Sequence, residues 1–93
     1  MTANGVTAYY YKWGRIVSIH ISGSLSADKD ANTTILTIPQ GYRPNREYEF
    51  SAWNASWSNG HKPVYINASG LFCGKTALAA GGLYGSCTYI CSE

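Results

Sequence analysis

The chain has 93 residues, a formal net charge of +2 and 13% charged residues, and we expect a single domain over residues 1–93. Its seven Lys and Arg residues are scattered and form no basic stripe, so nucleic acid is not an expected partner. No apolar run approaches the roughly 20 residues that a membrane-spanning helix needs, so no membrane insertion is expected.

The chain begins with a predicted antiparallel hairpin. Residues 7–12 are aromatic and β-prone, and the dipeptide Trp13-Gly14 reads as a tight turn. Residues 15–22 then alternate with a period of two, which predicts a half-buried strand. The apolar face of that strand consists of Val17, Ile19 and Ile21.

Three successive tyrosines stand in the first strand of this hairpin. Alternation places Tyr10 on the face opposite Tyr9 and Tyr11. One aromatic face therefore needs cover from outside a single sheet. Together with the small core expected of a chain this short, this predicts a homo-oligomer, most simply a homotrimer.

The rest of the chain alternates between short β-prone runs and polar or glycine-rich connections, and no helix is predicted. A polar loop is expected over residues 23–32, and a second, rich in Asn, Ser and Trp, over residues 53–63. Such spacing indicates an all-β fold, an antiparallel β-sandwich of jelly-roll-like form. The seven predicted strands cover residues 7–12, 15–22, 33–38, 46–52, 64–68, 71–73 and 84–91.

A proline- and glycine-containing corner ends the third predicted strand. Proline donates no hydrogen bond to a strand ladder, and glycine permits positive φ angles. Between two residues of fixed φ, Gly41 is expected to take a positive φ and reverse the chain. The corner and its structural motif consist of Pro39, Gly41, Tyr42, Arg43 and Pro44.

Residues 38–44 read Ile-Pro-Gln-Gly-Tyr-Arg-Pro, and this motif resembles one in the small C-terminal domains of phage and prophage tail structural proteins. The resemblance runs from about Tyr9 to the C-terminus. It also includes the hairpin of residues 12–23 and the Ile-x-x-x-Gly turn of residues 66–70. It implies a trimeric β-sandwich at a tail tip, and residues 1–93 would then be the C-terminal part of a longer tail protein.

The function implied by this resemblance is receptor binding without catalysis. We expect a domain of the virion tail, assembled in the host bacterial cytoplasm, with bacterial surface glycan and other tail proteins as partners. Two alternatives stay open. One is a purely structural trimerising tail module, and the other is a carbohydrate-binding module of a cell-wall hydrolase.

The candidate ligand site is a loop that combines aromatic rings with amides. A sugar ring stacks its apolar face on an aromatic side chain while amide and hydroxyl groups bind its hydroxyls. The alternative is that the tryptophans only plug the core and cover the edge of the sandwich. The candidate ligand-binding residues are Trp53, Asn54, Trp57, Asn59 and His61.

No catalytic, metal or cofactor site is predicted. The five acidic residues include Glu47 and Glu49 on one strand face, where solvated charge is the simpler interpretation than a glycosidase pair. The three cysteines lack the two-residue spacing of zinc ligands, and an odd number cannot all pair within one chain. We expect free thiols at Cys73, Cys87 and Cys91.

Overall fold

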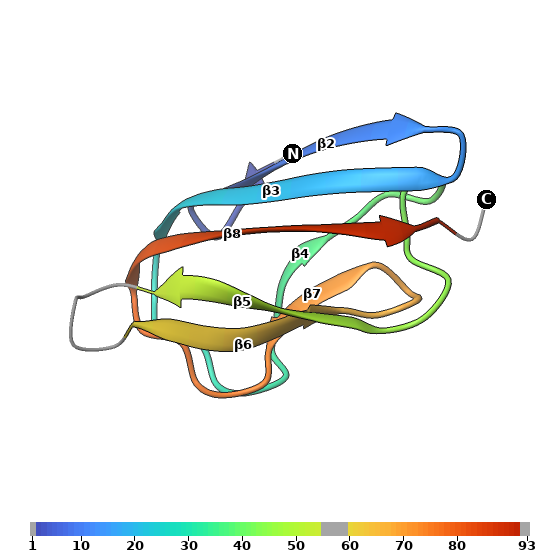
Figure 1. The fold of residues 1–93 in the computed structure, drawn as a ribbon. Helices are drawn as coiled ribbons and strands as arrows, with labels where there is room; N and C mark the ends of the chain where they lie inside the picture. Colours follow the sequence, from blue (N-terminus) through green and yellow to red (C-terminus); the bar gives the residue numbers. More distant parts are fainter. Residues whose placement is uncertain (1, 55–59, 92–93) are drawn as a thin grey trace.

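The computed structural model describes residues 2–54 and 60–91, and this part of the chain is all-β with no helix. One antiparallel sheet holds all eight strands in the order β1-β2-β3-β8-β5-β6-β7-β4 (Figure 1). The predicted all-β antiparallel class is confirmed. The strands are β1 (Thr2–Ala3), β2 (Val6–Trp13), β3 (Ile16–Leu25), β4 (Thr34–Thr37), β5 (Tyr48–Asn54), β6 (His61–Ile66), β7 (Leu71–Gly74) and β8 (Gly81–Ile90).

The sheet curls until its two edges meet, which makes it barrel-like. Strands β1 and β2 at one edge pack against β4 at the other, and the Asn4 side chain donates to the Ile35 carbonyl at 2.8 Å. The two layers expected of a sandwich are therefore two parts of one sheet, with β3, β8, β5 and β6 side by side in Figure 1. No helix in the described ranges has the length and apolarity to cross a bilayer.

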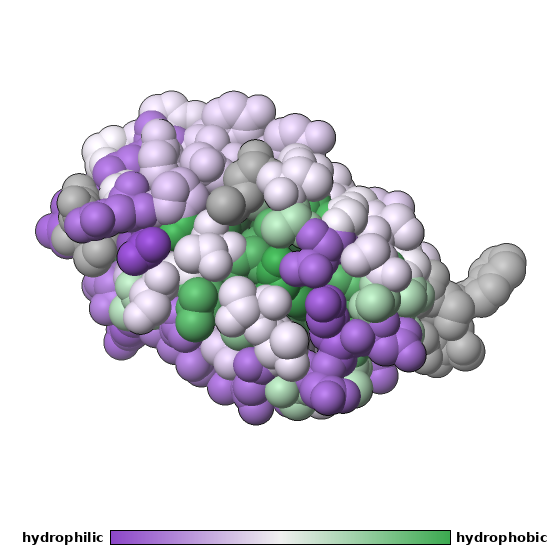
Figure 2. Space-filling view, turned by 180° about the vertical axis from the view of Figure 1, so that it is seen from behind, coloured by the Kyte–Doolittle hydropathy of each residue, from purple (hydrophilic) through white to green (hydrophobic). Residues whose placement is uncertain are grey.

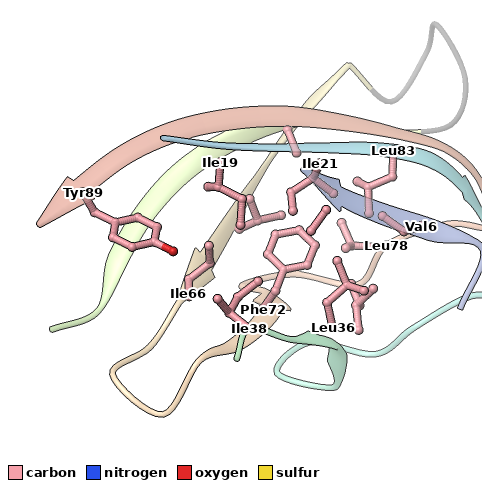
Figure 3. Close-up of a cluster of buried hydrophobic side chains, with 14 of the residues drawn as sticks. Val6, Ile19, Ile21, Leu36, Ile38, Ile66, Phe72, Leu78, Leu83 and Tyr89 are labelled. Atoms are coloured by element: carbon pink, nitrogen blue, oxygen red, sulfur yellow. The ribbon is translucent and has the colours of Figure 1, made fainter. Parts of the chain in front are cut away.

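The core lies inside this curled sheet and is built from inward-facing strand residues (Figure 3). The predicted inward face of the second strand is confirmed, because Val17, Ile19 and Ile21 are all buried. Phe72 packs against Phe50 with ring centroids 6.0 Å apart. From behind, apolar residues gather in a central strip with hydrophilic residues around it (Figure 2).

The predicted loop over residues 53–63 is too long. Strand β5 continues through Asn54 and β6 begins at His61, so both ends of the predicted loop lie in a hairpin. Pro63 was the misleading signal, because proline weakens a strand pattern. In the structure the Pro63 carbonyl accepts from the Lys75 backbone on the β7 side, so its nitrogen also points away from β5 and the β5 ladder loses no donor.

The short first strand is absent from the sequence-based prediction. It pairs with β2 through a turn at Asn4 and Gly5, whose φ angles are 54° and 81°. Asn-Gly is a strong two-residue hairpin signal, so the sequence did carry this information. Glycine is required here for a second reason, because a Cβ on Gly5 would lie 2.1 Å from the Ser24 carbonyl oxygen.

The proline-glycine corner closes one end of the barrel-like sheet. Gly41 has a φ of 95°, as the sequence predicts, and the Tyr42 N–H donates to the Pro39 carbonyl at 3.1 Å. The Gly41 carbonyl accepts from the Lys12 ammonium at 2.6 Å and from the Cys91 thiol at 3.1 Å. These bonds join the corner to the ends of β2 and β8.

The next two residues of the motif tie the corner to the core and to the end of β4. The Tyr89 hydroxyl donates to the Tyr42 carbonyl at 2.5 Å, and the Tyr42 ring packs 4.7 Å from the Tyr10 ring. The Arg43 side chain turns back and donates to the Ile38 carbonyl at 2.7 Å. The motif is therefore a structural clamp in this fold.

Replacing Gly41 by valine is expected to destabilise the domain by about 1–3 kcal/mol, because a β-branched residue is strained at positive φ. Nothing lies within 4 Å of the added Cβ, so the cost would come from the backbone alone. Chemical denaturation measures it, with Gln40→Val at the exposed neighbouring position as the control. Equal stability of the two variants would contradict a demanding backbone at Gly41.

Candidate functional site

The outward residues of β2, β3 and β8 form a surface that has no Asp, Glu, Lys or Arg, and we call it the uncharged face. Its residues follow from the alternation of the three strands and from their pairing. Because strands β2 and β8 flank β3, these side chains lie in adjacent rows. The uncharged face consists of Thr7, Tyr9, Tyr11, Trp13, Ile16, Ser18, His20, Ser22, Tyr84, Ser86, Thr88 and Ile90.

One end of the uncharged face is apolar, and we call it the hairpin-end cluster: Tyr11, Trp13, Ile16 and Ile90. Trp13 is 65% exposed and Tyr11 62%, with their rings stacked at 6.3 Å. Trp13 pairs with Ile16, and Ile16 pairs with Ile90, so a continuous apolar row crosses three strands. Tyr9 continues the aromatic line along β2 and is 52% exposed.

At the other end, Tyr84 of the uncharged face meets two residues of the neighbouring strands β5 and β6, and we call the three the loop-end cluster: Trp53, His61 and Tyr84. Trp53 pairs in register with His61 on β6 and with Tyr84 on β8, so the three side chains form a row on the outer side. The Trp53 and Tyr84 rings lie 5.6 Å apart. Gly82 makes room for this pair, because a Cβ there would lie 2.8 Å from the Trp53 ring.

Hydroxyl and imidazole groups separate the two clusters. Ser18 pairs with Thr88, and His20 pairs with Ser86, all on the outer side of β3 and β8. Their oxygens and nitrogens offer donors and acceptors between the aromatic ends. The uncharged face therefore combines stacking surfaces with polar groups that orient a ligand, on rigid strands rather than on loops.

The outer side of β5, β6 and β7 is organised differently. Tyr65, an aromatic residue of β6 on this side, is buried beneath the Lys75 ammonium, which lies 4.6 Å from the ring centroid. Lys75 in turn contacts Glu47 at 2.9 Å and Glu49 at 3.9 Å, and the hydrogen bond to Glu47 raises the pKa of Lys75. Glu47 and Glu49, expected to be solvated charges, thus hold a lysine over a tyrosine, a cover that the uncharged face lacks.

Among the predicted ligand residues, the structure brings Trp53 and His61 together on the outer side. Asn54 points the other way and is fully buried. Its amide donates to the carbonyls of Ala79 and Gly82, at 3.0 and 3.3 Å, and accepts from the Ala79 N–H at 2.9 Å. The Asn54 side chain is therefore hydrogen-bonded to backbone groups of the same chain. Trp57 and Asn59 lie outside the described residues.

Sequence reasoning did not show that Tyr84 and the outward residues of β2 belong to one surface. The aromatic residues were visible, but Tyr84 meets Trp53 only because β8 pairs with β5 across 31 positions of sequence. No local pattern encodes that pairing. The signal that was available is the exposed Tyr9 and Tyr11 face, which the alternation of β2 predicted and the structure confirms.

A hollow of about 290 Å³ opens at the loop end of the sheet, away from the uncharged face. Charges of both signs line it, together with Ala77, Leu78, Ala79 and the edge of Asn54. The charged residues that line it are Asp28, Lys29, Asp30 and Lys62. One of these is already engaged, because the Asp28 carboxylate accepts from the Ala80 N–H at 2.8 Å.

The cysteines and histidines form no metal centre in the described ranges, where no three His, Cys, Asp or Glu residues gather closely enough to hold an ion. As expected, Cys73, Cys87 and Cys91 are not joined by a disulfide. Cys73 and Cys91 are buried, and burial raises the pKa of Cys87 to about 11. The Cys87 thiol is therefore not poised as a nucleophile at neutral pH.

The cysteines should react slowly in the native protein at neutral pH. Burial shields Cys73 and Cys91, and the raised pKa keeps Cys87 protonated, so its labelling should accelerate as pH rises toward 11. After denaturation without reductant, titration should return three thiols per chain. A return of one thiol would reveal an internal disulfide and refute this.

Substituting Asn54 by alanine should lower the free energy of unfolding by on the order of 2 kcal/mol. The change leaves an N–H and two carbonyls without their buried partner, which typically costs about 1–3 kcal/mol. Chemical denaturation tests this. Asn45→Ala is the matched control, since Asn45 is exposed and its backbone bond to Ile90 is kept. If both variants are equally stable, Asn54 is free to serve a ligand.

The fold and this surface define a small antiparallel β-domain with an exposed aromatic face that lacks charge. No protein-family model matches the chain, and no curated protein matches it. What the domain does is therefore inferred from its surface and from the motif at residues 38–44.

Proposed function

We propose that this domain is a non-catalytic attachment module of a phage or prophage tail that binds bacterial surface carbohydrate. The observation that supports the proposal is the uncharged face, with its exposed rings of Tyr9, Tyr11, Trp13 and Tyr84 beside hydroxyl groups. Aromatic rings stack on the apolar faces of sugars, and hydroxyl and imidazole groups bind sugar hydroxyls. No cofactor is needed for such binding.

The exposure of these rings argues for a ligand rather than for packing within the domain. The core does not include them, because it is built from inward residues of the same strands. A contiguous apolar surface of this kind on a small protein usually marks an interaction site. Tyr and Trp side chains also lose little conformational entropy on binding, and neighbouring strands hold their backbones in place.

The tail assignment is supported by the motif of residues 38–44 and by its role in the fold. Pro39, Gly41 and Arg43 form a clamp at the hairpin end, away from the loop-end cluster. In this proposal the clamp fixes the scaffold, and the uncharged face meets the receptor. The domain would act in the virion tail after assembly in the host bacterial cytoplasm, beside other tail proteins and copies of itself in a homotrimer.

One observation favours a second candidate, a purely structural trimerising tail module. The row of Trp13, Ile16 and Ile90 is apolar across three strands, as the centre of a subunit contact often is. A carbohydrate-binding module of a cell-wall hydrolase would use the same face as the tail domain. Neighbouring tail genes would favour a tail domain, and a fused hydrolase domain would favour the carbohydrate-binding module of a cell-wall hydrolase.

Replacing Tyr11 by alanine should weaken adsorption to host cell-wall polysaccharide about tenfold, or about 1.4 kcal/mol. Its stability should change little, because the side chain is 62% exposed. Thr37→Ala, at an exposed position of β4, is the control and should bind as the parent does. Pull-down with purified polysaccharide measures binding, and light scattering on the same samples measures mass.

The two readouts separate the candidates. Weaker adsorption with unchanged mass supports the attachment module. Unchanged adsorption with a loss of oligomer mass supports the trimerising module and contradicts carbohydrate binding through this face. Carbohydrate binding would also be contradicted if the unsubstituted protein adsorbs to no carbohydrate.

A further inference from the structure

Resting on the proposed function, we infer that the carbohydrate is an uncharged, extended chain of several sugar units that spans the uncharged face from the hairpin-end cluster to the loop-end cluster. The inference specifies the ligand by length and by charge. Both properties follow from where the side chains stand.

The length follows from the spacing of the two clusters. Ile90 in the hairpin-end cluster and Tyr84 in the loop-end cluster are six residues apart on β8, which corresponds to about 20 Å at about 3.3 Å per residue. A single sugar is about as large as one aromatic side chain and cannot contact both. Only a chain of several units reaches from the Trp13 ring to the Trp53–Tyr84 pair.

The surface between the clusters suits a chain that lies flat. The rows between the two ends are occupied by Ser18, His20, Ser86 and Thr88, and all four stand on the paired strands β3 and β8. A pocket that grips one terminal sugar needs walls around it. The hollow described above is lined by none of these residues, and it lies away from the rows between the two clusters.

The neutrality of the ligand follows from the side chains that are missing. An anionic polymer placed on the uncharged face would lose hydration and find no Lys or Arg within the face to replace it. The domain uses its charges elsewhere, as with Lys75 between Glu47 and Glu49. A neutral polysaccharide pays no such desolvation cost, and salt should not screen its binding.

The experiment titrates the full chain with neutral oligosaccharides of increasing length, from the malto-, cello- and chito- series. Polygalacturonate serves as the acidic counterpart, and each titration is run at low and high salt. For at least one neutral series, affinity should rise with length and level off once both clusters are bridged. Salt should leave this affinity unchanged.

Two variants test the bridging directly. Trp13→Ala and Tyr84→Ala should each lower the affinity for the longest oligosaccharide, since each substitution removes a ring from one cluster. For the shortest bound oligosaccharide, only one of the two substitutions should matter, because that ligand reaches one cluster. Thr37→Ala on β4 is the control and should leave the affinity for both the longest and the shortest oligosaccharide unchanged.

The outcomes distinguish this inference from the proposed function. Binding confined to polygalacturonate, or a monosaccharide that binds as tightly as the longest chain, overturns the inference and leaves carbohydrate attachment standing. If no carbohydrate of either kind binds, both are overturned. If Trp13→Ala then lowers the oligomer mass, the uncharged face is a contact between copies of the chain.

Discussion

The pairing of β3 with β8 is the interaction on which the rest of the structure depends. It runs from Ile16 and Ile90 at one end to Leu25 and Gly81 at the other, and it joins the first hairpin to the β5–β6–β7 part of the sheet. Its inward residues supply the centre of the core, and its outward residues supply the middle of the uncharged face. Core and candidate site are thus two sides of one ladder.

Tyrosines on two parts of the outer side of the sheet differ in how they are covered. Tyr65 is covered by Lys75, which two glutamates hold in place, so its aromatic surface is removed from water within the domain. Tyr9 and Tyr11 receive no such cover. Long charged side chains can cover an apolar ring with their methylene groups while their charged ends stay in water. Their absence from the uncharged face is the reason to expect that something outside the chain contacts it.

Local patterns predicted most of the strands, because period-two alternation and turn residues are local properties. The inward face of β3 and the positive φ of Gly41 are both confirmed. Errors arose where composition misleads: Asn54 looked like part of a polar loop, although it ends a strand and its amide satisfies buried backbone groups. The candidate site could be predicted only in pieces, since the row of Trp53, His61 and Tyr84 exists through long-range strand pairing.

The insertion of β8 between β3 and β5 has a consequence for the kinetics of folding. Ile16 pairs with Ile90, so the central ladder closes a loop of most of the chain before its contacts form. Proteins dominated by such distant pairings fold slowly compared with those of local topology. The first hairpin and the β5–β6–β7 meander are each local and can form early, but the sheet becomes continuous between them only when β8 pairs with both β3 and β5. The aromatic rings of β2 and Trp53 of β5 come to lie on one surface only through this pairing.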